Sequence, residues 1–500
     1  MQFQPVIGME VHVETKTQSK MFCSCQNDLG LETRPNINIC PICTAHPGTL
    51  PVPNKEALVK LTRFGKALNC CISDYTWFER KSYFYPDLPK GYQITQYQRP
   101  LCYEGTLDIP VEYDKQVGIT RIHMEEDTGK LHHVAGTRKS YVDYNRAGIP
   151  LMELVTEPDI RSGEEARLFC EELQLILRYL DISDANMEKG QMRCEVNISL
   201  REEGSHVFGT KVEIKNLNSF RAVENAIAYE IQRQSYLLED GGEIIQETRG
   251  WDDAKGQTFS QRKKENADDY RYFLEPDIPP FETEELQQRA SEGMTELPAT
   301  KRERFTEEYG LDKQKSDTLV KDKYLAFYYE AVISELGEWM SSKHPEITDI
   351  AASDYGQKCM KLALNYLLTE LKPLEYEAQG GFVNPRITAE NYAEFITIIG
   401  DGIVSSSGAQ QLLGLMFETG GDPQDIVDEH KLAQVSDSSA LDTVIQTVID
   451  NNSDVVEKVQ NGKTQSIKFL VGQVMKETKG SANPEVAQQM LEARILGQDE

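Results

Sequence analysis

The stretch that decides the fold is VIGMEVHVE, residues 6–14, close to the start of the 500-residue chain. Its apolar and polar residues alternate, which is the pattern of a β-strand whose successive side chains point to opposite faces. Val11 and Val13 therefore share the face that a core would cover, whereas Glu10 and His12 share the opposite face. The stretch predicts a strand that has one face available for chemistry.

The same alternation recurs at residues 193–200 and 210–216, which a polar, Gly-containing connection joins, so we expect an antiparallel hairpin there. A helix is expected before this hairpin, because Ser162 and Glu165 have the spacing of a capping box and apolar residues follow at helical intervals. A second helix is expected over about 219–238. These elements favour an α+β fold with a mostly antiparallel sheet.

The length of the chain is enough for about three domains. An acidic segment punctuated by prolines, around residues 276–298, ends the β pattern, and the sequence that follows is helical. A weaker break falls near the Gly and Ser run at 400–408. We therefore expect a first domain over residues 1–294, a helical domain over 295–408 and a helical tail domain over 409–500.

The composition restricts the class of protein. The chain has 53 Lys and Arg against 81 Asp and Glu, a formal charge of −28, with 39% hydrophobic residues, as in a soluble globular protein. Such acidity argues against a protein whose whole surface binds nucleic acid, since that requires clustered cations. No signal peptide and no apolar run of about 18 residues is present, so we expect a cytoplasmic protein without a membrane span. Common nucleotide-binding and serine-hydrolase motifs are absent.

Four cysteines lie close together near the N-terminus. Cys23 and Cys25 form a CxC pair, and Cys40 and Cys43 form a CxxC pair. Two such pairs of thiolates can surround one tetrahedral Zn²⁺, and four sulfur ligands leave no position for a substrate, so the zinc would be structural. The alternative is a group of free thiols.

Acidic residues with a histidine form a second candidate cluster. Glu10 and His12 share a strand face, and Glu125, Glu126 and Asp127 follow one another in RIHMEEDTGK. Carboxylates gathered at one place repel one another unless a cation is bound, which favours a divalent metal site. The alternative, in a chain this acidic, is an ordinary solvated surface.

Residues 51–100 are basic in an otherwise acidic chain, with eight Lys and Arg against four acids, and they include RKSYFYPD at 80–87. Cations interleaved with aromatic rings can hold a nucleotide through phosphate contacts and stacking. The same pattern also fits an ordinary packed strand, so the residues alone leave both interpretations open.

A second basic segment lies in the tail, where five lysines fall within 22 residues that contain a single acid, Glu477. On a helix that starts at about Ser466, Lys468, Lys476 and Lys479 share one stripe beside an apolar face. Such a stripe can bind phosphates, or it can be a solvated lysine face.

Longer strings resemble a known family, the B subunits of the tRNA-dependent amidotransferases. The strings that carry the resemblance are GMEVHVE at 8–14, YFYPDLPKGYQI at 83–94, GTKVEIKNLNSF at 209–220, DYRYFLEPD at 269–277 and FLVGQVMK at 469–476. Because they are spread along the chain, the resemblance covers nearly all of it.

The resemblance implies a β-rich cradle domain, a helical domain and a small helical tail that contacts tRNA. It implies that ATP phosphorylates the side-chain carboxylate of misacylated Glu-tRNA(Gln), Asp-tRNA(Asn) or both, and that ammonia then displaces phosphate. Mg²⁺ would neutralise charge on the phosphates. The implied partners in a heterotrimer are the glutaminase, or A, subunit, which supplies the ammonia, and the small C subunit.

The resemblance also assigns residues. The metal and catalytic cluster would be Glu10, His12, Glu153 and Glu126, with Glu125 as the second choice, since only one of two consecutive strand residues can face the site. Lys81 would contact phosphate, with Tyr83 beside it. The four cysteines would bind structural zinc, and the lysines that would contact tRNA are Lys463, Lys468, Lys476 and Lys479.

Two other functions remain open at this point. A zinc-stabilised tRNA-binding scaffold, with the chemistry in a partner, would keep the cysteines and the tail lysines but would not need Glu10, His12 or Lys81. A self-contained amide ligase would amidate with glutamine without partner subunits.

Overall fold

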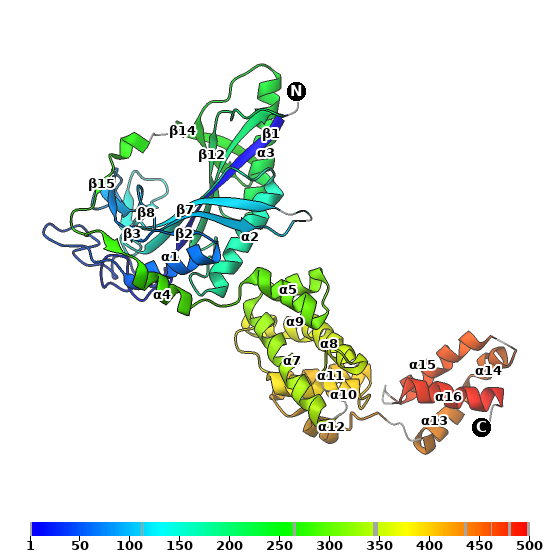
Figure 1. The fold of residues 1–500 in the computed structure, drawn as a ribbon. Helices are drawn as coiled ribbons and strands as arrows, with labels where there is room; N and C mark the ends of the chain where they lie inside the picture. Colours follow the sequence, from blue (N-terminus) through cyan, green and yellow to red (C-terminus); the bar gives the residue numbers. More distant parts are fainter. Residues whose placement is uncertain are drawn as a thin grey trace. The chain divides into compact units, whose positions relative to one another are not determined.

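The computed structural model describes residues 3–111, 113, 115–263, 267–343, 349–434, 438–461, 463–478 and 482–497. The chain divides into two compact units, Met1–Pro298 and Ala299–Glu500 (Figure 1). The first unit holds the β-structure, and the second is built of helices. The domain boundaries predicted after residues 294 and 408 stay predictions.

A nine-stranded sheet forms the centre of the first unit. Its strands, in spatial order, are β14 (Gln257–Lys263), β13 (Glu247–Asp252), β12 (Val212–Leu217), β11 (Met192–Glu202), β1 (Phe3–Glu14), β10 (Pro150–Thr156), β7 (Gln116–Glu126), β6 (Cys102–Asp108) and β2 (Cys71–Ile72). Every neighbouring pair is antiparallel except β12 and β13, which α3 (Phe220–Glu239) connects as a crossover helix. The predicted α+β class and the predicted hairpin of β11 and β12 are confirmed.

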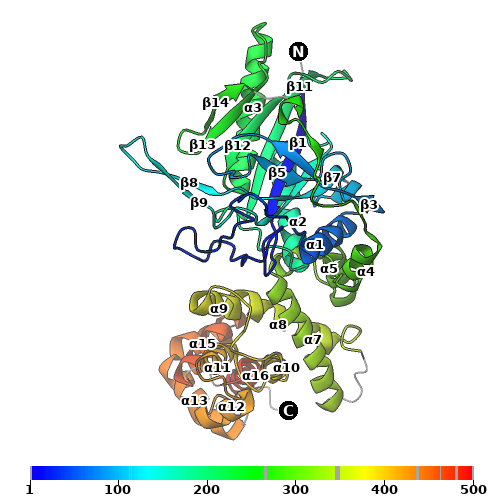
Figure 2. The same ribbon diagram turned by 90° about the vertical axis from the view of Figure 1, so that its left-hand side faces the viewer.

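Strand β1 lies in the middle of this sheet, between β11 and β10, and Figure 2 shows it in dark blue. Val11 and Val13 are 0% and 1% exposed and belong to the same core cluster as Phe169 of the helix α2 (Gly163–Tyr179). Glu10 and His12 therefore point to the opposite face, as their alternation predicts.

The two predicted helices of the first unit are confirmed, and each begins at a serine cap. The Ser162 hydroxyl accepts a hydrogen bond from the Glu165 backbone N–H, and the Ser219 hydroxyl accepts one from Ala222. The Glu165 carboxylate accepts from the backbone N–H of Arg161, one residue before the cap. Such caps satisfy N–H groups that have no partner within the helix. Two further helices, α1 (Lys55–Ala67) and α4 (Glu284–Glu292), pack together.

A small three-stranded sheet adds further residues to the site. It consists of β15 (Phe273–Leu274), β4 (Glu79–Ser82) and β5 (Tyr92–Thr95). The remaining short elements of this unit are β3 (Tyr75–Thr76), β8 (Lys130–His133), β9 (Ser140–Asp143), β16 (Phe281–Glu282) and the 3₁₀ turn Ala267–Tyr270.

The described helices of the second unit are α5 (Pro298–Tyr309, whose first residue belongs to the first unit), α6 (Lys313–Val320), α7 (Lys323–Lys343), α8 (Asp354–Tyr366), α9 (Lys372–Gln379), α10 (Ala389–Gly400), α11 (Ser406–Thr419), α12 (Pro423–His430), α13 (Ser438–Asn451), α14 (Ser453–Gln460), α15 (Ile467–Glu477) and α16 (Pro484–Leu496). A π-helical turn, Leu367–Leu371, joins α8 to α9. The last four helices share a core that includes Ile445, Leu470 and Leu491. None of the described helices of the chain is long and apolar enough to cross a membrane.

Candidate active site

A cavity of about 410 Å³ lies over the polar face of the large sheet. Its walls come from β1, β7, β10, β11 and β12, from the small sheet, and from Tyr270 and Tyr272. Apart from its two histidines, its acidic and basic side chains comprise six carboxylates and four cations: Glu10, Glu125, Asp127, Glu153, Glu195, Glu213, Lys81, Arg121, Arg193 and Lys215. Because the carboxylates outnumber the Lys and Arg side chains, the cavity would stabilise a bound cation.

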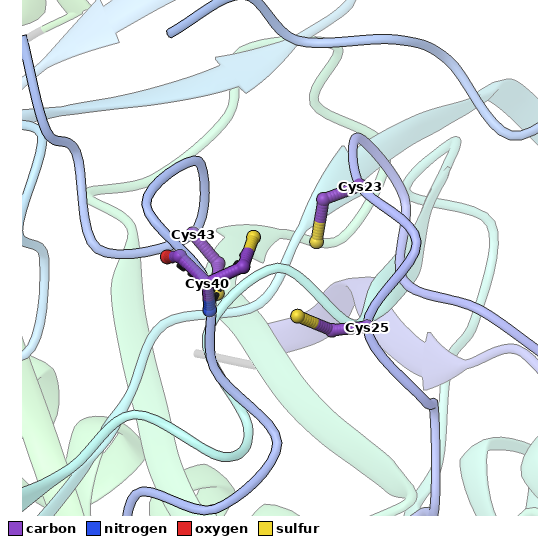
Figure 3. A group of neighbouring side chains, drawn as sticks. All are labelled: Cys23, Cys25, Cys40 and Cys43. Atoms are coloured by element: carbon purple, nitrogen blue, oxygen red, sulfur yellow. Dashed lines mark hydrogen bonds between the residues drawn. The ribbon is translucent and has the colours of Figure 1, made fainter.

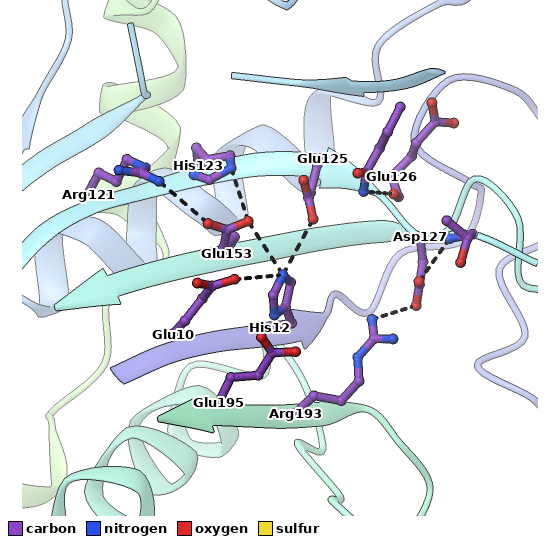
Figure 4. Close-up of polar contacts among 12 residues, drawn as sticks. Glu10, His12, Arg121, His123, Glu125, Glu126, Asp127, Glu153, Arg193 and Glu195 are labelled. Carbon is purple, nitrogen blue, oxygen red and sulfur yellow. Dashed lines mark hydrogen bonds and ion pairs between the residues drawn. The ribbon is translucent and has the colours of Figure 1, made fainter. Parts of the chain in front are cut away.

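Strand register brings residues that are far apart in the chain into one row. Arg193, His12, Glu153 and His123 are successive cross-strand partners on β11, β1, β10 and β7. Neighbouring strands lie about 4.8 Å apart, so side chains on one face of such a row can touch. The Oε2 of Glu153 lies 3.4 Å from Nε2 of His12 and 3.6 Å from Nε2 of His123, and Figure 4 shows this carboxylate between the two imidazoles.

Two more carboxylates approach the same histidine. Nε2 of His12 lies 3.7 Å from Oε1 of Glu125 and 4.0 Å from Oε1 of Glu10 (Figure 4). The ligand atoms of Glu10, His12 and Glu153 lie within 4.8 Å of one another, so the three could hold one ion. The buried Oε2 of Glu125 has no hydrogen-bond partner among the described residues. A buried carboxylate oxygen without a donor favours a bound cation.

The structure corrects the assignment at Glu126. Its carboxylate forms an ion pair with Lys90 and accepts a hydrogen bond from the Ile94 backbone N–H at 3.0 Å, on the face of β7 away from the cavity. Glu125 lines the cavity instead. Consecutive strand residues point to opposite faces, so both cannot join the cluster, and which one does depends on how β7 pairs with β10.

Burial and neighbouring charge shift the pKa values in the cluster. Burial raises the pKa of Glu10, and it raises that of Glu125 to about 7. Burial alone would lower the pKa of His12, but the hydrogen bond and the charge of Glu153 raise it to about 9. Burial opposes ionisation of Glu153 too, yet His123 and His12 hold its pKa well below the ordinary value. Without a metal, His12 is therefore protonated at neutral pH, and a metal that binds it must displace this proton.

Lys81 reaches the cavity from β4 of the small sheet, and its ammonium lies 5.1 Å from the Tyr270 ring centroid and 6.0 Å from that of Tyr83. Burial alone would lower its pKa, but the carboxylates of Glu125 and Glu153 raise it above the ordinary value. A permanently charged ammonium beside a carboxylate cluster is suited to bind a phosphate that a metal also contacts.

Several cavity residues were not predicted from the sequence. The rings of Tyr97 and Tyr272 stack with centroids 4.2 Å apart and an interplanar angle of 9°, and the Arg121 guanidinium lies 5.9 Å from the Tyr97 centroid. Arg121 and His123 share the strand parity of Glu125 in RIHMEED, so alternation could have identified both. No comparable local signal places the tyrosines there, because they come from different segments.

The four cysteines lie together in the loops that follow β1 (Figure 3). Their sulfurs lie within 4.8 Å of one another, and those of Cys40 and Cys43 are 3.9 Å apart. Tetrahedral Zn²⁺ with bonds of about 2.3 Å separates its sulfur ligands by roughly 3.8 Å, so the arrangement fits that ion. A hydrogen bond from Cys23 lowers the pKa of Cys43 to about 5, and the charge of Lys20 acts in the same direction.

The tail lysines differ in what the structure describes. Lys468 and Lys476 are exposed on α15, whose opposite face buries Leu470 and Val474, and Lys463 is exposed just before this helix. Among the described residues, no carboxylate lies within ion-pair distance of these three lysines. Lys479 lies outside the described residues.

Comparisons with known proteins agree on one family. The model of the GatB/GatE catalytic domain matches residues 5–288, and that of the GatB domain matches residues 348–495. The B subunit of the aspartyl/glutamyl-tRNA(Asn/Gln) amidotransferase of Caldicellulosiruptor saccharolyticus is 45% identical over 507 residues, 99% of both chains. The B subunits of the same enzyme from Persephonella marina and Carboxydothermus hydrogenoformans are 45% identical over 494 residues and 44% identical over 501 residues. They cover 98% and 99% of this chain, and each match spans 99% of the relative.

Proposed function

Because the chain belongs to the family of the GatB/GatE catalytic domain, we propose that it acts as the subunit of a tRNA-dependent amidotransferase that carries the kinase and amidation site. Its substrates are misacylated Glu-tRNA(Gln), Asp-tRNA(Asn) or both. The observation that supports this most directly is that Lys81 and the carboxylates around His12 line one cavity.

The reaction needs two steps because a carboxylate is a poor acyl donor. In the first step, an oxygen of the substrate's side-chain carboxylate attacks the γ-phosphorus of ATP, and ADP leaves with the electrons of the broken P–O bond. In the second step, the lone pair of ammonia attacks the carbonyl carbon, and phosphate leaves. The nitrogen then loses a proton to give the amide. Positioning of the reactants and neutralisation of their charge account for most of the rate acceleration in such phosphoryl transfers.

Cations of the chain itself neutralise phosphate charge in this proposal. Lys81 binds a phosphate, and Arg121 and Arg193 hold further negative charge at the cavity wall. Tyr83 and the stacked Tyr97 and Tyr272 present aromatic faces to the nucleotide and exclude water from that side.

The same cavity fits a divalent cation. Glu10, His12, Glu125 and Glu153 would hold Mg²⁺, with Glu125 in the place first given to Glu126. When bound, Mg²⁺ supplies positive charge to the phosphate oxygens as phosphoryl transfer proceeds. The surplus of carboxylates and the unpartnered oxygen of Glu125 support this assignment, although His12 departs from the oxygen ligands that Mg²⁺ prefers.

The rest of the chain has supporting roles in the proposal. The four cysteines hold a structural Zn²⁺, and Lys463, Lys468 and Lys476, with Lys479, contact tRNA phosphates. The relatives are named as subunits, so two further chains, the glutaminase or A subunit and the small C subunit, complete the enzyme, and the glutaminase supplies ammonia.

The alternative of a tRNA-binding scaffold gains no support from the site, because a scaffold has no use for a carboxylate cluster beside a charged lysine. Lys81→Met in the complex reconstituted with its partner subunits separates the two functions. We expect ATP cleavage that depends on misacylated tRNA to fall on the order of 100-fold or more, with tRNA affinity unchanged. Lys255→Met, at an exposed turn, is the matched control.

Unchanged ATP cleavage and amidation by the Lys81→Met complex would assign the chemistry to another chain of the enzyme.

A test of the isolated chain addresses the self-contained ligase. We expect no amidation from glutamine without the partners, whereas amidation by the chain alone would establish the self-contained activity.

A further inference from the structure

Lys20 is a fully buried lysine that the proposed reaction does not use. It follows β1, and 0% of its surface is exposed. Its ammonium donates to the backbone carbonyl oxygens of Asn38 at 2.7 Å and Tyr144 at 3.3 Å, and it lies 3.9 Å from Sγ of Cys43. Three acceptors match the three N–H donors of a charged ammonium, whereas a neutral amine has only two.

The charge of this lysine lacks the usual kind of partner. Among the residues that the structure describes, no carboxylate lies within 4.0 Å of the Lys20 ammonium. Burial of an unpaired charge is strongly unfavourable, so a buried lysine requires a nearby anion. Of the three acceptors given above, the sulfur of Cys43 is the one that can carry negative charge, since the other two are neutral carbonyl oxygens.

We propose that Lys20 is the counter-cation of the metal–thiolate centre formed by Cys23, Cys25, Cys40 and Cys43, and that it joins this centre to the segment 144–149, whose backbone is hydrogen-bonded to Asp127 of the active-site cavity. One Zn²⁺ with four thiolates keeps two negative charges, which a buried ammonium partly balances. Partners of this kind outside the ligand set orient ligands and tune metal affinity.

The contacts of the segment 144–149 connect the centre with the cavity. The Gly148 N–H donates to the Asp127 carbonyl at 2.9 Å, and the Asp127 N–H donates to the Ile149 carbonyl at 2.8 Å. The Asp127 carboxylate accepts from Arg193 at 2.9 Å, and both side chains line the cavity. Lys20 holds the first residue of this segment through Tyr144, so its loss should loosen the support of Asp127.

The test uses the purified full-length chain loaded with Zn²⁺ and titrated with a competing chelator. Lys20→Met removes both charge and donors, Lys20→Gln keeps hydrogen bonding without the charge, and Lys20→Arg keeps the charge. Lys16→Met is the matched control, because Lys16 is partly exposed and its ammonium pairs with Asp184 at 2.6 Å. We expect zinc affinity to fall 10- to 100-fold in the two neutral variants, to remain nearer the wild-type value in Lys20→Arg, and to be unchanged in the control.

Two further measurements report on the centre and on the segment separately. With Co²⁺ in place of Zn²⁺, the thiolate-to-metal charge-transfer band should move to longer wavelength in Lys20→Gln, because loss of the nearby charge raises the energy of the sulfur electrons. Hydrogen exchange of a peptide that covers residues 144–149 should become faster in Lys20→Gln but not in Lys16→Met.

The outcomes separate the parts of the proposal. A wild-type chain that binds no zinc overturns the metal centre itself. Zinc affinity and cobalt spectrum unchanged in Lys20→Gln overturn the role of Lys20 as counter-cation, and unchanged exchange at 144–149 overturns its role in joining the segment. If Lys20→Met does not fold, the comparison of Lys20→Gln with Lys20→Arg decides, since both keep hydrogen-bond donors at this position.

Discussion

Nε2 of His12 lies 3.4 Å from Oε2 of Glu153, because the two residues are direct partners in the register of β1 and β10. This pair sets the charge state of the candidate metal site. The carboxylate raises the pKa of His12 to about 9, so the free site holds a proton where the proposed ion would bind.

Mg²⁺ affinity should therefore rise with pH. His12 must lose its proton to act as a ligand, so we expect affinity to increase about tenfold per pH unit between pH 7 and 9 and to level off above that range. Calorimetric titration in buffers of different ionisation enthalpy measures both the affinity and the protons released. His132→Gln, at an exposed histidine, should leave the profile unchanged, and a profile that is flat in the wild type would remove His12 from the ligand set.

Folding stability of the metal-free first unit should depend on pH through the same group. The folded-state pKa of His12 lies above the ordinary value, so its contribution is full below about pH 6.5 and is lost as the pH rises towards 9. In Glu153→Gln, the pKa of His12 should fall because its main partner is gone. Histidine NMR titration of the wild type and of Glu153→Gln measures the pKa of His12 in each protein. Equal pKa values would show that Glu153 does not set the charge of His12.

Glu125 and Glu126 should behave differently when each is changed to Gln. Glu125→Gln should weaken Mg²⁺ binding and reduce amidation on the order of 100-fold, because Glu125 faces the cavity. Glu126→Gln should lower the thermal unfolding temperature of the first unit, because breaking a buried ion pair costs roughly 3–5 kcal/mol, and it should leave Mg²⁺ affinity intact. Weaker Mg²⁺ binding in Glu126→Gln, with normal Mg²⁺ binding in Glu125→Gln, would instead identify Glu126 as the ligand.

The stacked tyrosines should contribute to nucleotide binding. Tyr272→Leu removes an aromatic face beside Tyr97, and we expect it to weaken ATP binding by about 1–3 kcal/mol, the range measured for base stacking on aromatic side chains. Tyr272→Phe keeps the ring and serves as the control. The KM for ATP, measured with saturating misacylated tRNA, distinguishes them, and equal values would exclude a contact with the nucleotide.

The tail lysines should make tRNA binding sensitive to salt. A double variant with Lys468→Gln and Lys476→Gln should weaken binding and reduce the slope of log affinity against log salt by about 1.5, since each phosphate contact contributes roughly 0.7–0.9. Lys458→Gln is the control, because its ammonium already pairs with Asp454 at 3.5 Å. Filter binding over a range of salt concentrations gives the slope, and an unchanged slope would place the tRNA contact elsewhere.

Zinc should be lost when one ligand is removed. Cys40→Ser leaves three thiolates, so we expect zinc content to fall well below one ion per chain and the first unit to unfold at a lower temperature. Elemental analysis of the purified chain measures the metal, and Cys71→Ser, at an exposed cysteine outside the cluster, is the control. If Cys40→Ser retains as much zinc as Cys71→Ser, Cys40 is not a zinc ligand and the proposed zinc site is wrong.

Local pattern was sufficient for part of the site. Alternation placed Glu10 and His12 on one face of a strand, the spacing of Ser162 and Glu165 marked a helix start, and the cysteine pairs were recognised from spacing alone. Alternation also requires that only one of Glu125 and Glu126 face the site. The polar Arg121 and His123 share the parity of Glu125, whereas the apolar Ile122 and Met124 share that of Glu126, so the strand pattern favours Glu125, although the resemblance points to Glu126.

By itself, the sequence determined which residues share a face, where helices begin and, through its resemblance, the family. These properties depend on residues that lie close together in the sequence, or on motifs that can be recognised in it directly. Only the tertiary structure decided that β1 lies between β10 and β11, that Glu153 therefore meets His12, and that Lys20 reaches Cys43 and Tyr144. Those contacts join segments distant in the chain, and backbone hydrogen bonding and core packing set their register, which no local period encodes.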